Sequence, residues 1–212
     1  AQDAESIVRL RQSQAQGLLR IGTSVAFGRR VIVPLALEYM ERNPQVQVDL
    51  SFEDRYVDLV AQGIDVAVRM GKLADSSLGA RFLGRNPWVM VAAPSYLKQH
   101  GTPRRAQDLS GHVALIYSSV VGDDVWQMHT PKGEAVVVPV SGRLRSNNVS
   151  AVLAATRAGL GVALMPRYVA EESIKAGSVV EVLADHGLAE QEIHAVFPSP
   201  KLVPGKVSSF VA

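Results

Sequence analysis

The sequence contains no cysteine among its 212 residues. This absence excludes disulfide bonds, thiolate nucleophiles and cysteine-rich zinc sites. A chain without disulfides fits the reducing cytoplasm, the compartment that we expect for this protein. Histidines do not replace cysteine as clustered metal ligands, because no two of the five histidines stand three or four residues apart. We therefore expect no metal and no cofactor.

Long apolar runs and an excess of one charge are also missing. The longest apolar stretches, such as 88–93 and 159–165, are far shorter than the roughly 20 residues that cross a bilayer. No membrane association is expected. Lysine plus arginine number 22, against 20 for aspartate plus glutamate. Nucleic-acid binding needs basic residues on one face, whereas the basic groups here are short and far apart, so direct DNA contact by this chain is not predicted. These groups are Arg29 with Arg30, Arg104 with Arg105, and Arg143 with Arg145.

The first 70 residues alternate between strand-like and helix-like patterns. Gly17 closes a polar stretch, 1–17, that resembles the end of a helix begun earlier. An α/β alternation of this kind predicts a parallel sheet with right-handed crossovers. The expected elements are a strand at 18–23, a helix at 25–42 with Pro34 beginning a new helical segment, a strand at 46–52, a helix at 55–62 and a strand at 64–69.

The rest of the chain predicts a second α/β unit that is inserted before the first unit is complete. The turn at 130–133 predicts a hairpin between two extended runs. The expected elements are strands at 78–83, 87–93 and 113–117, a hairpin of 125–129 with 134–140, strands at 161–165, 179–183 and 192–197, and helices at 94–100, 149–158 and 167–176, with a last helix from Pro204.

Several catalytic and nucleotide-binding motifs are absent or incomplete. The stretch Gly22-Thr23-Ser24-Val25-Ala26 lacks the second glycine of a nucleophile elbow. Gly159-Leu160-Gly161 runs from a helix into a strand, the reverse of the order in a dinucleotide fingerprint. Small residues that tighten a helix-to-strand turn explain this second stretch better.

Polar residues follow the expected strands at three places. Thr23-Ser24 and Ser146-Asn147-Asn148 each precede a helix, and Arg69 closes the strand of GIDVAVRMG. Unpaired N–H groups at a helix start bind anions or accept an ordinary N-cap, and both interpretations stay open here. Arg69 either lies in solvent or faces something anionic. In a two-lobed α/β fold these features would meet at the carboxyl ends of the strands.

In the order and spacing of its motifs the chain resembles the effector-binding domain of LysR-type transcriptional regulators. The resemblance covers nearly all residues from 18 to 212. The segments that carry it are GLLRIG at 17–22, YMERNP at 39–44 followed by VQVDL, DRYVDLV at 54–60 with GIDVAVRMG at 63–71, VAAPSYLKQHG at 91–101 and AGLGVALMP at 158–166.

The resemblance implies an α/β fold of two lobes with a cleft between them, like type 2 periplasmic binding proteins. Residues 1–17 would end the family's linker helix, 18–90 with 190–212 would form lobe I, and 91–189 would form lobe II. Strands near 88–93 and 192–197 would act as hinges. The family's winged helix-turn-helix is missing here, so DNA binding would come only from that domain. Full-length members are typically tetramers whose effector domains pair side by side.

The resemblance also implies a small effector in the cleft, which we expect to be a carboxylate or another anion. Arg69 would bind the carboxylate or brace Asp54, and Met165 would form an apolar wall. Carried over position by position, the effector-binding residues are Thr23, Ser24, Asp54, Arg69, Ser118, Asn147, Asn148 and Met165.

Two other functions remain open from the sequence. A periplasmic solute receptor would share the fold, although the cut helix at 1–17 argues against it. An enzyme is the third possibility, but the related pyrrole-polymerising enzyme attaches its cofactor to a cysteine, which this chain lacks. Since no acid–base pair stands at a usable spacing, we do not expect an enzyme.

Overall fold

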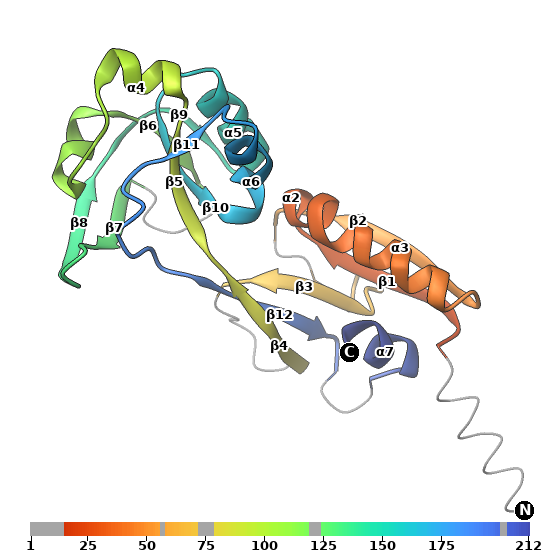
Figure 1. Ribbon diagram of the computed structural model, residues 1–212. Helices are drawn as coiled ribbons and strands as arrows, with labels where there is room; N and C mark the ends of the chain where they lie inside the picture. The colour runs from red at the N-terminus through yellow and green to blue at the C-terminus, as the bar shows by residue number, and fades with distance from the viewer. Residues whose placement is uncertain (1–14, 56–57, 72–78, 119–123, 200–202) are drawn as a thin grey trace, which may run out of the picture. The chain divides into compact units, whose positions relative to one another are not determined.

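The computed structural model describes residues 15–55, 58–71, 79–118, 124–199 and 203–212. The chain forms two compact units: unit 1 is Ala1–Gly84 with Glu192–Ala212, and unit 2 is Arg85–Gln191 (Figure 1). The chain was expected to pass from one lobe to the other near residues 90 and 190; in the structure it passes between the two units at 84–85 and 191–192. Strand β5 (Trp88–Ala92), expected as a hinge, pairs throughout with strands of unit 2, which explains the earlier first crossing.

The chain crosses between the units in β4 (Gly79–Asn86) and at the start of β12 (Gln191–Phe197). The linker helix expected at 1–17 falls mostly on residues outside the described ones. Gly17 itself is the first residue of strand β1 (Gly17–Thr23), with a positive φ of 86° that glycine adopts without strain.

The sheet of unit 1 has the strand order β2-β1-β3-β12-β4. Strand β1 (Gly17–Thr23) lies between β2 (Val46–Phe52) and β3 (Val66–Met70) and is parallel to both, as the α/β alternation predicts. Strand β12 returns antiparallel to β3. The three parallel strands consequently end at the same edge of the sheet.

One continuous helical segment follows β1 and packs on one face of this sheet. It consists of α2 (Val25–Phe27), a π-helical turn η1 (Gly28–Ile32) and α3 (Val33–Arg42). Pro34 stands in the first turn of α3, so the prediction of a new segment at this proline is confirmed. A Cβ on Gly28 would lie 2.5 Å from side-chain atoms of Thr23 and Phe52, so the π turn needs glycine to approach the sheet.

The helix predicted at 55–62 is wrong for the residues that the structure describes there. Residues 59–63 form turns, and the Asp58 carboxylate accepts hydrogen bonds from the N–H groups of Val60 (2.9 Å) and Ala61 (3.1 Å). An aspartate that bonds the backbone two and three residues on competes with helix formation. Leu59 is buried, whereas its neighbour Val60 is 67% exposed.

Helix α7 (Gly205–Val211) closes unit 1 and begins just after Pro204, as predicted. The Tyr39 hydroxyl donates to the carbonyl of Lys206 at 3.0 Å, and the Tyr39 and Phe210 rings meet edge to face with centroids 5.3 Å apart. Lys206 lies 3.3 Å from the Asp65 carboxylate. These contacts attach the last helix to α3 and to the start of β3.

The sheet of unit 2 has the strand order β11-β5-β10-β6-β9. Strand β6 (Val113–Tyr117) is parallel to β9 (Ser141–Ser146) and to β10 (Val162–Pro166), whereas β5 is antiparallel to β10 and to β11 (Val180–Glu181). The predicted hairpin is confirmed as β7 (Val125–His129) paired with β8 (Ala135–Pro139). Strand β9 was not predicted, because SGRLRS holds a single large apolar residue.

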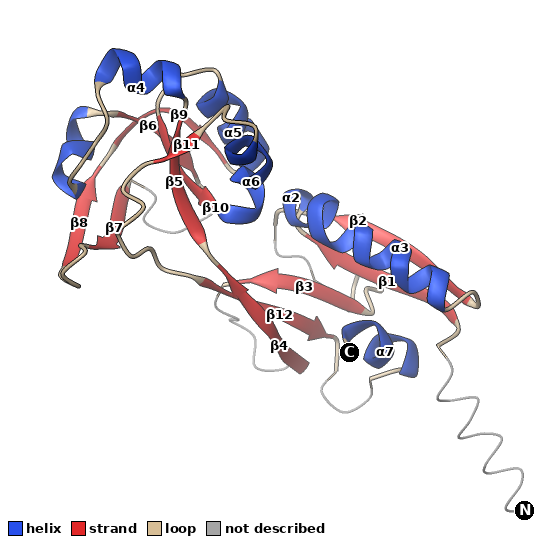
Figure 2. Ribbon diagram, in the orientation of Figure 1, coloured by secondary structure: helices blue, strands red, loops and turns tan. Residues whose placement is uncertain are grey.

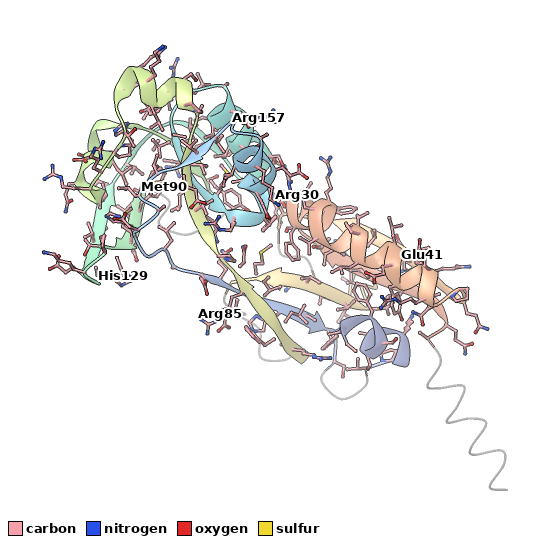
Figure 3. All side chains as sticks on the ribbon, in the orientation of Figure 1. Arg30, Glu41, Arg85, Met90, His129 and Arg157 are labelled. Carbon is pink, nitrogen blue, oxygen red and sulfur yellow. The ribbon has the colours of Figure 1, made fainter. Side chains whose placement is uncertain are left out.

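Helices and the hairpin cover the two faces of this sheet (Figure 2). Helices α5 (Val149–Arg157) and α6 (Arg167–Lys175) pack on one face. On the other face, α4 (Pro94–His100), the 3-10 helix η2 (Ala106–Gly111) and the hairpin enclose a core that includes Met90. Figure 3 labels Met90 within this unit and His129 at the end of β7.

The helix-to-strand turn at 159–161 is a packing feature, as the order of its glycines suggests. Gly159 has φ 75° and donates to the carbonyl of Thr156, while Leu160 donates to that of Ala155, the pattern of a Schellman C-cap. A Cβ on Gly161 would lie 2.4 Å from the backbone oxygen of Val113. Strands β10 and β6 therefore approach closely only because residue 161 is glycine.

We predict that Gly161→Ala lowers the free energy of unfolding by about 1–3 kcal/mol, since backbone must shift to admit the methyl group. Gly111→Ala is the matched control, because a Cβ there would meet no heavy atom within 4 Å. Urea unfolding followed by tryptophan fluorescence measures the change, as both tryptophans, Trp88 and Trp126, belong to unit 2. Equal midpoints for the two variants would contradict the close-packing account.

Candidate functional site

The candidate site of unit 1 lies where β1, β2 and β3 end together. Thr23, the last residue of β1, is in register with Phe52 on β2 and with Val68 on β3. The carboxyl ends of parallel strands are the usual binding edge of an α/β sheet. Asp54 follows β2, and Ser24 follows β1, at this same edge.

Thr23 carries the most unusual polar atom of this edge. The residue is 5% exposed, and its hydroxyl Oγ1 is buried without a hydrogen-bond partner among the described residues. Its backbone carbonyl, by contrast, accepts the N–H of Glu53 at 2.8 Å. An unsatisfied buried hydroxyl costs about 1–3 kcal/mol, so such atoms are rare. A ligand that reaches this edge can supply the missing bond.

Ser24 occupies the N-cap position of α2, but its side chain makes no capping bond. The carboxylate of Asp54 instead accepts the N–H of Val25 at 2.9 Å. Ordinary N-capping was one of the two alternatives for Ser24, and the Ser24 side chain does not act as an N-cap in the structure. The negative charge that a helix start favours is already supplied by Asp54.

Arg69 leaves the sheet on the face opposite to Thr23. In the register of β1 with β3, Thr23 shares its face with Val68, and Gly22 shares the opposite face with Ala67 and thus with Arg69. Arg69 is half-buried and pairs across the sheet with His194 on β12. Of the three donor-rich features expected to line one cleft, the two in unit 1, Thr23 and Arg69, thus start from opposite faces of its sheet.

The candidate site of unit 2 lies at the ends of β6 and β9. Ser118 follows β6, and its N–H donates to the carbonyl of Ser146 at 2.9 Å. Asn148 is the N-cap of α5: its Oδ1 accepts the N–H groups of Ser150 (3.0 Å) and Ala151 (3.2 Å). Ordinary N-capping therefore explains the Asn148 carbonyl, whereas the neighbouring Asn147 is exposed.

Met165 is placed differently from the expectation of an apolar wall. It has 0% exposure in β10 and pairs with Val89 on β5, on the sheet face that α5 and α6 cover. The long apolar side chain of Met165 is part of the hydrophobic core, because both faces of its strand are covered by other elements.

Sequence reasoning missed three polar and aromatic residues that fix the ends of the crossing strands within unit 2. The side-chain oxygen of Gln191 accepts from Asn86 Nδ2 (3.2 Å) and from Trp88 Nε1 (3.1 Å). Trp88 in turn stacks on Tyr117, the last residue of β6, with centroids 5.9 Å apart. Gln191 is more than 100 positions away from Asn86 and Trp88, and Trp88 is 29 positions from Tyr117, so no local sequence pattern predicts these contacts.

Arg167, the charged residue that follows β10, already has an ion-pair partner within unit 2. Arg167, the first residue of α6, forms a two-pronged ion pair with Glu181 at 2.8 and 3.0 Å, and the Glu181 hydrogen bond raises the pKa of Arg167.

In the described part of the chain no group of three histidines, aspartates or glutamates is placed to hold a metal ion. Across the same residues, no helix has the length and apolarity to cross a membrane.

We predict that Asn148→Ala lowers the free energy of unfolding of unit 2 by about 1 kcal/mol through loss of the helix cap. Asn147→Ala is the control, since an exposed side chain of this kind should change stability by less than about 0.5 kcal/mol. Guanidinium unfolding monitored by tryptophan fluorescence separates the two. An equal loss in both variants would mean that Asn148 does not act as the cap.

Comparison with known proteins gives one consistent answer. The model of the LysR substrate binding domain matches residues 12–212. An uncharacterized HTH-type transcriptional regulator of Haemophilus influenzae is 30% identical over 206 residues, which are 97% of this chain and 71% of that protein. The chain spans only 56% to 62% of three further curated relatives. The names of all four describe transcriptional regulators rather than enzymes.

Solved structures agree with the sequence matches. The full-length Vibrio cholerae virulence activator AphB, described as a member of the LTTR family, superposes with a TM-score of 0.81 at 30% identity, covering 99% of this chain and 72% of that one. The regulatory domain of CrgA from Neisseria meningitidis gives a TM-score of 0.81 at 25% identity, with 92% and 96% coverage. The α/β fold with two periplasmic-binding-protein-like lobes is therefore confirmed, and the chain belongs to the family of LysR substrate-binding domains, the regulatory part of LysR-type transcriptional regulators.

Proposed function

We propose that this chain is the ligand-sensing and oligomerisation domain of a bacterial LysR-type transcriptional regulator, and that it binds a small effector in the cleft between its two units. The observation that carries the proposal is the buried, unpartnered hydroxyl of Thr23 at the carboxyl end of β1. A polar atom that stays unsatisfied in the free protein favours a function in which another molecule completes it.

The remaining polar groups restrict the chemistry of the effector. The hydroxyls of Thr23 and Ser24 donate to or accept from any polar ligand, and Asn147 and Ser118 offer the same in unit 2. Asp54 adds a carboxylate at the start of α2, which disfavours a bare anion at that point. An effector that joins a carboxylate to a hydroxyl or ammonium group suits this set, with the carboxylate directed to the unit 2 donors. Arg69, which starts from the opposite face to Thr23, would take part only by reaching around the end of β3.

Control of transcription would be indirect. The names of the relatives identify them as HTH-type regulators that are longer than this chain, so DNA contact would belong to a helix-turn-helix part and take place in the cytoplasm. The effector would act by changing how these domains assemble. The periplasmic solute receptor gains no support from relatives of this kind.

A second copy of the chain is the partner that we propose for α3 and β2. Leu37 is 57% exposed on α3, and Leu35 and Met40 are exposed with it. Strand β2 lies at the edge of its sheet, with its outer backbone groups available for pairing. Exposed apolar side chains beside an open strand edge are typical of surfaces that another chain covers.

We predict that Thr23→Val abolishes effector binding and leaves the melting temperature of the free protein unchanged or raised, because it replaces an unsatisfied buried hydroxyl with a methyl group. A thermal-shift screen against small carboxylates, hydroxy acids and amino acids measures both effects. An effector at about 100 times its Kd should raise the Tm of the unmutated chain by roughly 5–10 °C.

Thr156→Val is the matched control for this substitution. Thr156 is equally buried, but its hydroxyl donates to the carbonyl of Val152 at 2.8 Å, so its loss should lower the Tm and leave the effector shift intact. Ser24→Ala and Arg69→Ala should weaken binding with the fold retained. If Thr23→Val binds as tightly as the unmutated chain, the Thr23 edge is not the effector site.

We predict that Leu37→Glu shifts the chain toward monomer in sedimentation velocity, because a charge in an apolar contact between copies is costly. Val60→Glu places the same charge at another exposed apolar position of unit 1, away from α3, and should leave the oligomeric state as it is. An unchanged distribution for Leu37→Glu would exclude α3 from the contact.

A further inference from the structure

We propose that Tyr96, His100 and His112 form a proton-sensitive anchor that fastens helix α4 to the start of strand β6 while His112 is neutral and releases it when His112 is protonated. This anchor lies within unit 2 and does not depend on the proposed effector. Three observations carry it: the burial of Tyr96, the hydrogen-bond pattern around its hydroxyl, and the different bonding of the two histidines.

Tyr96 is the centre of the anchor. It is 1% exposed in α4 and is among the largest fully buried side chains of the chain. Its hydroxyl oxygen accepts the N–H of Val113, the first residue of β6, at 3.0 Å. The same oxygen lies 3.0 Å from Nδ1 of His112. One buried hydroxyl thus joins α4 to both the strand and the residue before it.

The hydrogen-bond capacities of these groups set the proton of His112. The Val113 N–H is always a donor, so it uses a lone pair of the Tyr96 oxygen. The Tyr96 O–H then finds its partner in His112 Nδ1, which must carry a lone pair, with the ring proton on Nε2. Protonation of Nδ1 turns His112 into a donor and leaves the Tyr96 O–H buried without an acceptor among the described residues.

His100 responds to a proton in the opposite way. Its Nδ1 lies 3.1 Å from the backbone carbonyl of Tyr96, which only accepts, so Nδ1 of His100 already carries a proton. The ring stacks on Tyr96 with centroids 4.3 Å apart and ends helix α4, where a cation is favoured. A charged His100 keeps its bond, and its charge opposes a second one on His112.

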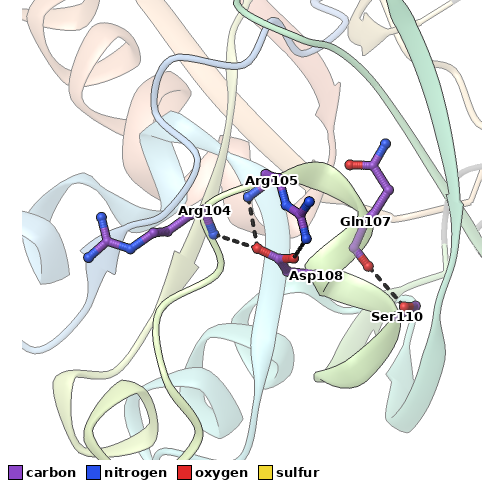
Figure 4. Close-up of polar contacts among 5 residues, drawn as sticks. All are labelled: Arg104, Arg105, Gln107, Asp108 and Ser110. Carbon is purple, nitrogen blue, oxygen red and sulfur yellow. Dashed lines mark hydrogen bonds and ion pairs between the residues drawn. The ribbon is translucent and has the colours of Figure 1, made fainter.

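The other charged groups of the anchor come from α4 and from the start of η2. Lys98 stands in the last turn of α4 and is exposed. Asp108 would favour a proton on His112, but its carboxylate already accepts the backbone N–H groups of Arg104 and Arg105 at 3.0 Å each and pairs with the Arg105 guanidinium at 3.1 Å (Figure 4). Its charge is therefore largely engaged.

The pKa values follow this geometry. Burial, and next the charge of His100, lower the pKa of His112 below its ordinary 6.5, and Asp108 opposes the shift. The backbone hydrogen bonds from Arg104 and Arg105 lower the pKa of Asp108 in turn. Below pH 6.5 the unfolded chain therefore binds more protons at residue 112 than the folded chain does. The stabilisation of the folded chain by neutral His112 is complete above pH 6.5, and it is lost as the pH falls through the pKa of His112 in the folded chain.

The anchor connects to the candidate site through a single strand. Strand β6 begins at Val113, whose N–H the anchor holds, and ends at Tyr117, which stacks on Trp88. Release of the first residue frees one end of a strand that lies between β10 and β9. Acidification would therefore loosen unit 2 from the α4 side, with the largest effect at α4 and β6.

Amide exchange of Val113 measures the anchor directly, because this N–H is one of its hydrogen bonds. In NMR exchange experiments on the 212-residue chain, we expect its protection, corrected for intrinsic exchange, to fall roughly tenfold between pH 7.5 and 5.5, the effect of one buried hydrogen bond. His112→Asn offers a side-chain oxygen that accepts from Tyr96 and does not titrate. Its protection should stay flat over the same range.

Two controls make the result specific. His129→Asn removes an exposed histidine of the same unit and should keep the unmutated pH dependence. Tyr96→Phe should lower Val113 protection at every pH. The proposal is overturned if His112→Asn loses protection as the unmutated chain does, or if the unmutated chain shows no loss. Should His112→Asn fail to fold, ring titration of His112 in the unmutated chain decides, since a native pKa at or above the ordinary value would also overturn it.

Discussion

Parallel pairing around one central strand is the constraint on which both units depend. In unit 1, β1 lies between β2 and β3, and in unit 2, β6 lies between β9 and β10, each parallel to both neighbours. Parallel strands need crossovers that lay helices on the sheet, and the start of each helix then meets the carboxyl ends of the strands. The polar groups at 23–24 and 54 in unit 1, and those at 146–148 in unit 2, each lie at strand ends for this reason, and the proposed function rests on that placement.

The two helix starts at these edges are both capped from within the chain. Asp54 reaches across from the end of β2 to the N–H of Val25, and Asn148 caps α5 with its own side chain. The donors most suited to an anion are thus partly occupied, whereas the buried Thr23 hydroxyl at the unit 1 edge has no hydrogen-bond partner among the described residues. We propose that a site arranged in this way would discriminate by hydrogen bonding more than by charge, because an analogue that lacks the matching group leaves a buried polar atom unpaired.

Much of the fold could be predicted from the sequence, since strands and helices with a clear apolar period kept it in the structure. Strands β1, β2 and β3, the β7–β8 hairpin and the new helical segment at Pro34 are confirmed. The errors have local causes. Asp58 bonds the backbone after it and prevents the helix predicted at 55–62, and β9 escapes notice because its neighbours, not its apolar content, make it a strand. Met165, expected at the binding edge, belongs to the core.

The sequence by itself determined the family, the α/β alternation with its inserted second unit, and the positions of polar residues after strands, because periodicity and turn chemistry are local properties. Only the tertiary structure decided which of these polar groups already have hydrogen-bond partners within the chain. Sheet register and contacts between distant segments decide three of these points. Asp54, rather than Ser24, accepts the N–H of Val25; Arg69 and Thr23 project from opposite faces of the sheet; and the Tyr96 hydroxyl is hydrogen-bonded to His112. Hydrogen bonds are satisfied by whichever groups the folded backbone brings within about 3 Å, and the choice among distant partners leaves no mark on the local pattern.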